Sequence, residues 1–123
     1  MKRNTSQRKA IQEVFLQDDR PLGVKEILNI GRHEVDTLNQ ATVYRNLKIL
    51  VQKGWLRKVY HPKLGILYER ADKDHRHHFH CRSCDRLFEI PCCTLNEKAF
   101  TPPGFITEGH QVFLFGLCTS CNE

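Results

Sequence analysis

The chain has 123 residues, a formal net charge of +5 and 40% hydrophobic residues. This length suits one domain or two small ones, and the hydrophobic content argues against an intrinsically disordered chain. The first ten residues have no apolar stretch, so we expect neither a signal peptide nor a membrane anchor. Six cysteines without an export signal then indicate metal ligands and not disulfides. They also indicate a cytoplasmic location.

Charge and metal-binding residue types divide the chain near residue 70. Residues 1–70 hold 14 Lys and Arg against 7 Asp and Glu, whereas residues 71–123 hold 5 against 7. All six cysteines and five of the seven histidines lie in the second part. We therefore expect two domains, 1–72 and 73–123, of which the first is a candidate for binding a polyanion. A solvated lysine-rich surface is the alternative.

Two short amphipathic helices are expected first. Ile11, Val14 and Phe15 share one helical face, and Pro21 follows the end of that helix. The apolar positions of segment 24–28 predict a second helix that stops near a glycine three residues later.

The third helix is the clearest in the sequence. Asn39 is a suitable N-cap and Gly54 a suitable stop. Between them runs an apolar stripe of Val43, Leu47, Leu50 and Val51. The opposite face is polar and contains Thr42, Tyr44, Arg45, Lys48 and Gln52.

Strand-like runs 55–61 and 66–69 flank the turn signal 62–65, which predicts a β-hairpin. Three helices and a hairpin are the element order of a winged helix-turn-helix, whose recognition helix enters the major groove. The expected DNA contacts are Thr42, Tyr44 and Arg45 on the helix, with Lys48, Arg57 and Lys58 placed for phosphates. A helical bundle with a basic outer face would show the same periodicity.

The second half alternates strand-like runs with cysteine turns. Strands are expected around Phe79, over 87–90 and over 111–115, and a short helix over 94–100. A small sheet with one helix is the simplest architecture, so the whole chain is expected to be α+β, with a winged helix-turn-helix followed by a zinc-stapled α/β domain.

The strongest chemical signal is a pair of Cys-x-x-Cys turns, Cys81/Cys84 and Cys118/Cys121. One such turn presents two thiolates to one ion, and two turns complete a tetrahedral zinc site. A redox pair is the alternative for a single turn. A small domain needs the folding free energy of such a site, on the order of 10 kcal/mol.

A histidine-rich segment, 74–80, directly precedes Cys81. In a strand, residues of like parity share a face, so His78 and His80 would face one way and His75 and His77 the other. Two faces could serve two ions. Glu69, Glu89 and His110 could add ligands, and polar filler is the alternative for the cluster.

Cys92 and Cys93 are adjacent, and adjacent cysteines rarely bind one metal together. Their role stays open between buried small apolar residues and an accessory thiol site.

Several of these motifs occur in the order found in the ferric uptake regulator family, which this chain resembles over nearly its whole length. They are the segments 4–8, 41–47 (Ala-Thr-Val-Tyr-Arg-Asn-Leu), 65–69, the histidine run, and 116–121 (Gly-Leu-Cys-Thr-Ser-Cys). The resemblance implies a homodimeric winged-helix repressor that binds double-stranded operator DNA when a regulatory metal is present, with the four-cysteine zinc as a structural site.

The resemblance places the sensor site on Glu69, His78 and Glu89. Two customary histidine ligands fall on Arg76 and near Pro21. His80 shares a face with His78 and is a candidate replacement.

A third family site maps onto His75, His77 and His110. Asn96 stands where the family has a carboxylate, and the adjacent Glu97 is the expected substitute. Zinc is the first choice of effector, as in a zinc uptake regulator, and iron(II) the second.

Two other classes of function are the alternatives. A metal-stapled interaction module would share the cysteine site without binding DNA. A zinc hydrolase would need an open metal position, a general base and a substrate cleft, and the sequence has no helical His-Glu-x-x-His pattern.

Overall fold

A computed structural model describes residues 2–73, 76–91 and 93–123, with side chains from residue 6 onward. The chain separates into two compact units, Met1–Lys73 and Asp74–Glu123. None of the described helices has the length and apolar character needed to cross a membrane.

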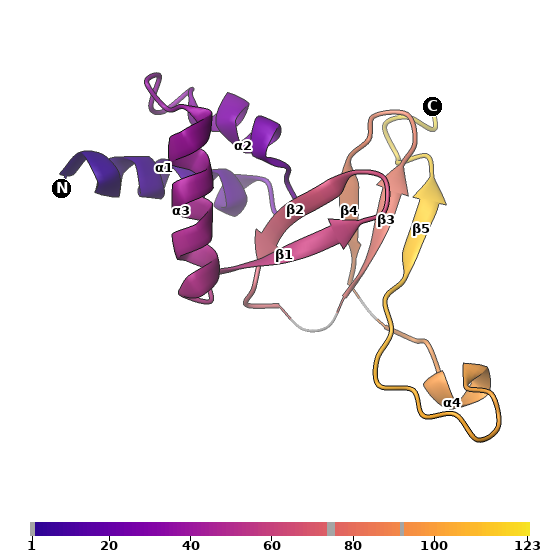
Figure 1. Ribbon diagram of the computed structural model, residues 1–123. Coiled ribbons are helices and arrows are strands. Elements are labelled where there is room, and N and C mark those ends of the chain that lie inside the picture. Colours follow the sequence, from indigo (N-terminus) through magenta and orange to yellow (C-terminus); the bar gives the residue numbers. More distant parts are fainter. Residues whose placement is uncertain (1, 74–75, 92) are drawn as a thin grey trace. The chain divides into compact units, whose positions relative to one another are not determined.

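The first unit contains three helices and a hairpin (Figure 1). The elements are α1 (Lys2–Gln17), α2 (Val24–Gly31), α3 (Gln40–Gln52), β1 (Leu56–His61) and β2 (Gly65–Arg70). This is the element order expected for a winged helix-turn-helix. Helix α1 is 16 residues long and contains the predicted apolar face of Ile11, Val14 and Phe15, all of which are buried.

One apolar core holds this unit together. The fully buried side chains come from all three helices and the hairpin, and include Ile11, Phe15, Leu22, Ile27, Leu38, Val43, Leu47, Leu50 and Leu56. Phe15 and Trp55 meet edge to face, with ring centroids 6.2 Å apart. The core thus fixes the buried side of α3 and leaves its other side to solvent.

Local chemistry defines both ends of α3. Asn39 Oδ1 accepts a hydrogen bond from the Thr42 backbone N–H at 2.9 Å, which is an N-cap. Gly54 follows the helix with φ +78°, a conformation that favours glycine over residues with a Cβ. Both boundaries were predicted from these two residues.

A short extended segment at Leu22, between α1 and α2, joins the hairpin to the helices. Strands β1 and β2 pair antiparallel from Leu56↔Arg70 to His61↔Gly65. Leu22 then exchanges two backbone hydrogen bonds of 2.8 Å with Tyr68. The segment between α1 and α2 therefore anchors the hairpin within the same unit as α3.

The second unit is a three-stranded sheet with one turn of helix. Its elements are β3 (His77–Cys81), β4 (Leu87–Ile90), α4 (Glu97–Phe100) and β5 (Phe113–Gly116). The strand order is β4-β3-β5, with β3 antiparallel to β4 and parallel to β5. Helix α4 is shorter than expected because Asn96, within the expected range, caps its start by accepting from Lys98 N–H. The α+β class is confirmed.

The packing of α3 gives a stability prediction. Leu47→Ala should lower the free energy of unfolding of the first unit by about 2–5 kcal/mol, because Leu47 is fully buried and the substitution leaves a cavity. The neighbouring Lys48→Ala removes an exposed side chain and should change it by less than about 0.5 kcal/mol. Urea unfolding followed by circular dichroism measures both, and equal losses would contradict the assigned faces of α3.

Candidate metal centres and nucleic-acid interface

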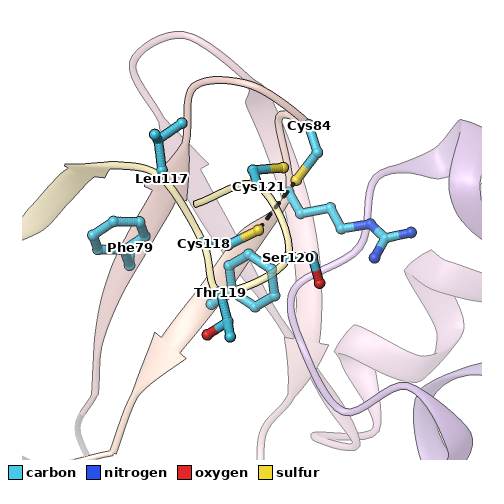
Figure 2. A pocket seen from close by; sticks show the side chains of 9 residues that line it. Phe79, Cys84, Leu117, Cys118, Thr119, Ser120 and Cys121 are labelled. Carbon is cyan, nitrogen blue, oxygen red and sulfur yellow. Dashed lines mark hydrogen bonds between the residues drawn. The ribbon is translucent and has the colours of Figure 1, made fainter. Parts of the chain in front are cut away.

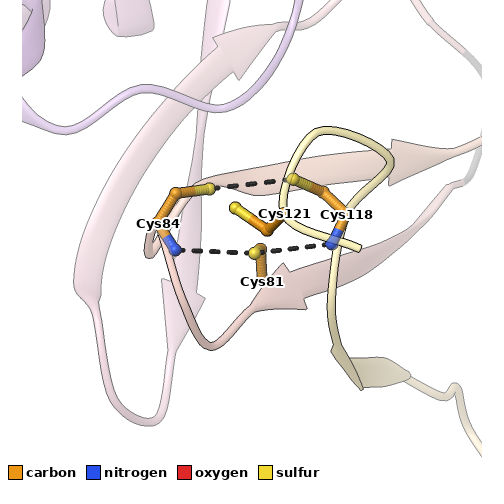
Figure 3. Close-up of side chains that lie close together, drawn as sticks. All are labelled: Cys81, Cys84, Cys118 and Cys121. Atoms are coloured by element: carbon orange, nitrogen blue, oxygen red, sulfur yellow. Dashed lines mark hydrogen bonds between the residues drawn. The ribbon is translucent and has the colours of Figure 1, made fainter. Parts of the chain in front are cut away.

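Four cysteines meet at one end of the sheet in the second unit (Figure 3). Cys81 is the last residue of β3, and Cys118 follows β5 by two residues. Strands β3 and β5 are parallel and in register at Cys81↔Gly116, so the turns that follow them leave the sheet at the same end. Sequence order alone did not reveal this parallel pairing, which brings together two cysteine turns 37 residues apart.

The thiol positions fit a tetrahedral zinc ion. All four Sγ atoms lie within 4.8 Å of one another, and Cys84 Sγ and Cys118 Sγ are 3.9 Å apart. Sulfur atoms bound to one zinc at about 2.3 Å are separated by about 3.8 Å. A disulfide would need a separation of about 2.05 Å, and all four thiols are free.

Backbone amides already favour the thiolate at the buried member of this cluster. The N–H groups of Cys84 and Cys118 point at Cys81 Sγ from 3.5 and 3.4 Å. They lower the pKa of the Cys81 thiol to about 6. A thiolate is the form that binds metal, so the amides of the two turns favour the metal-binding form of Cys81.

A cavity of about 650 Å³ opens beside the cysteine cluster (Figure 2). Its lining combines aromatic residues of the sheet with the second cysteine turn: Phe79, Cys84, Arg86, Phe88, Leu117, Cys118, Thr119, Ser120 and Cys121. Cys84, Cys118 and Cys121 line it, whereas Cys81 is fully buried. Three of the four thiols are therefore reachable by a metal or a chelator from solution.

A second cluster joins His77, Cys93 and His110. His77 Nε2 lies 3.0 Å from Cys93 Sγ and 3.1 Å from His110 Nε2, and Cys93 Sγ lies 3.1 Å from His110 Nε2. Two members of the predicted third site are thus brought together. His75, also predicted there, lies outside the described residues.

Glu97 occupies a different position from the one expected of a ligand. Its Oε2 lies 2.6 Å from His110 Nδ1, on the side of the ring away from the cluster. The carboxylate therefore orients the imidazole, because it reaches the far ring nitrogen and not the shared point of the three ligand atoms.

The sequence left two roles open for Cys93, a buried apolar residue or an accessory thiol site, and the first of these is wrong. The residue is exposed and not a buried apolar side chain. The Leu95 backbone N–H and the His110 side chain lower the pKa of its thiol, and Glu97 and Cys93 raise the pKa of His110. The spacing of Cys93 from His110 in sequence gives no local signal for this contact, which forms only in the fold.

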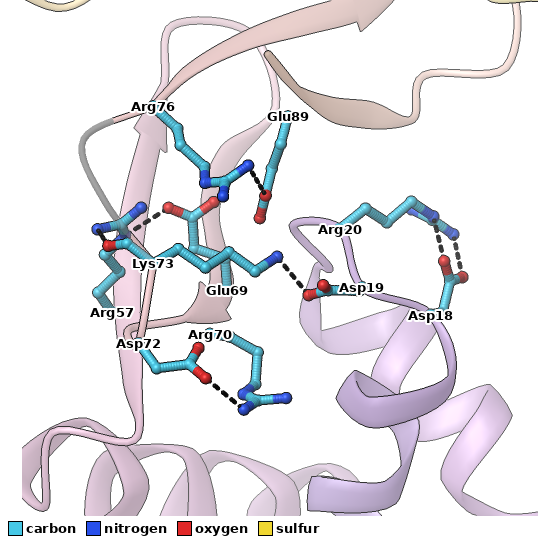
Figure 4. A network of polar contacts seen from close by, with 10 residues as sticks. All are labelled: Asp18, Asp19, Arg20, Arg57, Glu69, Arg70, Asp72, Lys73, Arg76 and Glu89. Carbon is cyan, nitrogen blue, oxygen red and sulfur yellow. Dashed lines mark hydrogen bonds and ion pairs between the residues drawn. The ribbon is translucent and has the colours of Figure 1, made fainter. Parts of the chain in front are cut away.

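Three of the predicted sensor residues contact other charged groups, and Figure 4 shows the two glutamates among them. In the first unit, buried Glu69 accepts a hydrogen bond from Arg57 Nε at 2.5 Å. In the second unit, Glu89 Oε2 lies 3.5 Å from Arg76 Nη1, and His80 Nε2 lies 3.0 Å from Asp85 Oδ1.

The second unit brings one pair of these residues together. His78 on β3 lies directly opposite Glu89 on β4 in the sheet register. The His78 ring also stacks on Phe113, with centroids 5.9 Å apart. Among the described residues of this unit, His78, His80 and Glu89 do not form a cluster of three ligand atoms. Arg76 supplies the positive charge beside Glu89, at the position where the resemblance led us to expect a histidine.

The proposed DNA-contacting residues divide by exposure. Tyr44 is 50% exposed, and Arg45, Lys48 and Lys58 are exposed as well. Thr42 was expected on the open face but is buried at the start of α3, where its Oγ1 accepts a long hydrogen bond of 3.4 Å from Arg45. Thr42 and the next residue, Val43, are buried, although the two residues before them in the same turn are exposed. Arg57 is partly buried by its pair with Glu69.

An additional basic contact was missed from the sequence. Arg8 Nε donates to Asn46 Oδ1 at 3.2 Å, and the Asn46 amide donates to the Thr42 carbonyl at 2.9 Å. This chain of bonds ties α1 to α3 beside the exposed Tyr44 and Arg45. No local pattern pointed to it, because the two residues are 38 positions apart.

The sequence was compared with protein families and with known proteins, and both comparisons find metal-uptake regulators. The model of the ferric uptake regulator family matches residues 2–114. The chain is 28% identical to the ferric uptake regulation protein of Bordetella parapertussis, over 97% of this chain and 88% of the relative. It is also 28% identical to the zinc uptake regulation protein of Mycobacterium tuberculosis, over 98% and 95%.

The fold agrees with a solved structure of the family. The ferric uptake regulator of Helicobacter pylori superposes with a TM-score of 0.71 at 24% identity, over 95% of this chain and 80% of the other. The family match spans both units, including the exposed side of α3 and the first cysteine turn. The chain therefore belongs to the ferric uptake regulator family, a family of transcriptional regulators and not of enzymes.

Proposed function

We propose that this chain is a metal-responsive repressor that binds operator DNA as a homodimer, with a structural zinc at Cys81, Cys84, Cys118 and Cys121. The observation that carries the proposal is the exposed face of α3, where Tyr44 and Arg45 stand opposite the apolar side of the helix that packs into the core. Family membership supports the same function. A regulator of this kind works in the cytoplasm, where DNA is accessible.

In the proposed complex, α3 contacts the bases, and exposed cations on α3 and the hairpin contact the phosphates. Arg45 near the start of the helix is able to grip a base edge with two hydrogen bonds, and Tyr44 to reach a phosphate or a thymine methyl group. Lys48 and Lys58 are exposed cations for phosphates. Arg57 remains a phosphate candidate only if it gives up its bond to Glu69, and buried Thr42 acts by holding Arg45.

The homodimer is supported by the exposed apolar side of the second unit. Strand β5 lies at an edge of the described sheet. Its Leu114 and Phe115 are 51% and 79% exposed, and Phe105 and Ile106 are 70% and 89% exposed. An open strand edge with large apolar side chains is a typical site for pairing with another chain.

Zinc is the proposed effector, with iron(II) second. The carboxylates of the expected sensor set, Glu69 and Glu89, each have an arginine beside them in their own unit, which weakens the case that they bind a metal. The cluster of two imidazoles and one thiol is the better candidate, and such ligands favour zinc.

The contacts of Glu97 argue against a zinc hydrolase, whereas the interaction module needs an experiment to separate it from a DNA-binding protein. A zinc hydrolase needs a base poised at an open metal position, but the carboxylate nearest the second cluster, Glu97, is bonded to His110. A metal-stapled module without DNA binding is separated by the experiment that follows.

Substitutions on α3 test the recognition helix. Arg45→Ala should weaken binding to a duplex recovered by selection from random DNA by roughly 5- to 150-fold, since a bidentate base contact contributes about 1–3 kcal/mol. Tyr44→Ala should also weaken it, and the double variant should abolish measurable binding. Fluorescence anisotropy in the presence of zinc gives the affinities.

Lys98→Ala is the charge-matched control, because it removes one exposed cation from the second unit. Its affinity should stay at the wild-type value. Wild-type affinity should also fall with salt, with a log–log slope of roughly −0.9 per phosphate contacted. A double variant that binds like the wild type would rule out α3 as the recognition helix, and a wild type without duplex binding would favour the interaction module.

Removal of one cysteine tests the structural zinc. Wild-type protein should keep one zinc per chain through dialysis against a mild chelator, and Cys118→Ser should lose it. Since a structural site contributes on the order of 10 kcal/mol to folding, the second unit of the variant should become sensitive to protease. Ser120→Ala, in the same turn, is the matched control, and full zinc retention in Cys118→Ser would overturn the assignment.

A further inference from the structure

A histidine side chain holds the turn of the hairpin in the first unit. Strands β1 and β2 end their pairing at His61↔Gly65, so residues 62–64 form the loop between them. His61 Nδ1 accepts hydrogen bonds from the backbone N–H groups of Lys63 at 3.1 Å and of Leu64 at 3.0 Å. The residue is only 8% exposed. One buried imidazole nitrogen therefore binds two consecutive amides of the loop.

This nitrogen engages every backbone donor that the loop has. Pro62, the remaining loop residue, has no N–H, and its fixed φ suits the second position of a type I turn. Gly65 follows with φ +81°, as in hairpin loops that join a type I turn to one left-handed residue. Asp, Asn or Ser usually supplies the side-chain acceptor at the first position of such a turn. His61 is able to replace them because its Nδ1 lies as many bonds from Cα as the Oδ1 of an asparagine.

The two hydrogen bonds define the protonation of the His61 ring. An imidazole nitrogen accepts a hydrogen bond through its lone pair, so Nδ1 carries no proton, and a neutral ring carries its proton on Nε2. The bonds also decide what the loop offers to a ligand. Since both amides donate to the ring, an anion that approaches the turn meets side chains and not backbone N–H groups.

The charged side chains of this part of the hairpin are all basic. Residues 56–66 contain Arg57, Lys58 and Lys63 and no acidic residue. Lys63 is exposed in the loop, and Lys58 is exposed on β1. The hairpin follows α3 within the same unit, and a helix in the major groove has a phosphate backbone on either side. A cation held at the turn of this hairpin suits a phosphate that flanks the groove.

We propose that Lys63 contacts a DNA phosphate and that His61 is its positioning residue, acting through the loop amides that Nδ1 holds. This inference rests on the proposed DNA binding by α3 and adds a contact outside that helix. A phosphate contact places the protein on the duplex without reading sequence. The contribution of Lys63 should therefore be the same on duplexes of different sequence.

The ring and the loop are measured first in the full-length protein without DNA. In mildly alkaline solution, where imidazoles are neutral, ¹H–¹⁵N spectra of the wild type should show His61 protonated at Nε2 and not at Nδ1. His61→Asn keeps an acceptor at the same reach, and His61→Gln moves it one bond farther. The amides of Lys63 and Leu64 should exchange with solvent at the wild-type rate in His61→Asn. They should exchange roughly 2- to 12-fold faster in His61→Gln, the factor for one lost hydrogen bond.

Affinity for the selected duplex, from fluorescence anisotropy, tests the contact itself. Lys63→Ala should weaken binding roughly 2- to 12-fold and reduce the salt slope by about 0.9, whereas Lys98→Ala should change neither. His61→Gln should also weaken binding, and His61→Asn should keep the wild-type affinity. The double variant His61→Gln/Lys63→Ala should bind as Lys63→Ala does, because His61 acts through Lys63. His33→Gln alters an exposed histidine of the same unit and is the control.

Four results would each overturn the proposal: a proton on Nδ1 of His61, wild-type affinity in Lys63→Ala, equal affinities of His61→Asn and His61→Gln, or a double variant that binds more weakly than Lys63→Ala. If His61→Gln fails to fold, the wild-type ring and Lys63→Ala still decide. A wild type that binds no duplex would overturn the proposed function and the phosphate contact with it. The His61 turn would then still be confirmed by an unprotonated Nδ1, so the two failures are distinguishable.

Discussion

Strand β3 is the element on which both candidate metal clusters of the second unit depend, because it carries one residue of each. His77 stands at its start and Cys81 at its end. It is the central strand, and its backbone pairs with β4 on one side and with β5 on the other. Zinc at the cysteines would lock β3 to the turn after β5. The same restraint fixes where His77 meets His110, the residue that precedes β5.

An arginine side chain pairs with each carboxylate of the sensor site that the family resemblance predicted. A buried carboxylate is costly unless a cation or hydrogen-bond donors satisfy it. Arg57 does this for Glu69 in the first unit, and Arg76 does it for Glu89 in the second. The metal response that we propose for this chain would then use other ligands, and the cluster of His77, Cys93 and His110 is our candidate for them.

Periodic and capping signals predicted most of the fold, because they act within a few residues. Asn39 and Gly54 marked α3, and the alternating apolar runs marked the hairpin and β4. The Cys-x-x-Cys spacing likewise predicted the four-cysteine group. Long-range pairings were beyond such patterns. The parallel contact of β3 with β5, the burial of Thr42, the position of Glu97 on the far side of His110 and the approach of Cys93 all depend on how distant segments pack.

The most direct test of this account is the duplex affinity of the protein as free zinc is varied, with the four-cysteine zinc kept in place. An effector acts only by binding one state of the protein better than another. The account predicts that wild-type affinity for DNA rises roughly tenfold or more over the range of free zinc in which the His77–Cys93–His110 site fills, and that Cys93→Ser loses this rise. Affinity that stays constant while the site fills, or an unchanged zinc response in Cys93→Ser, would contradict it.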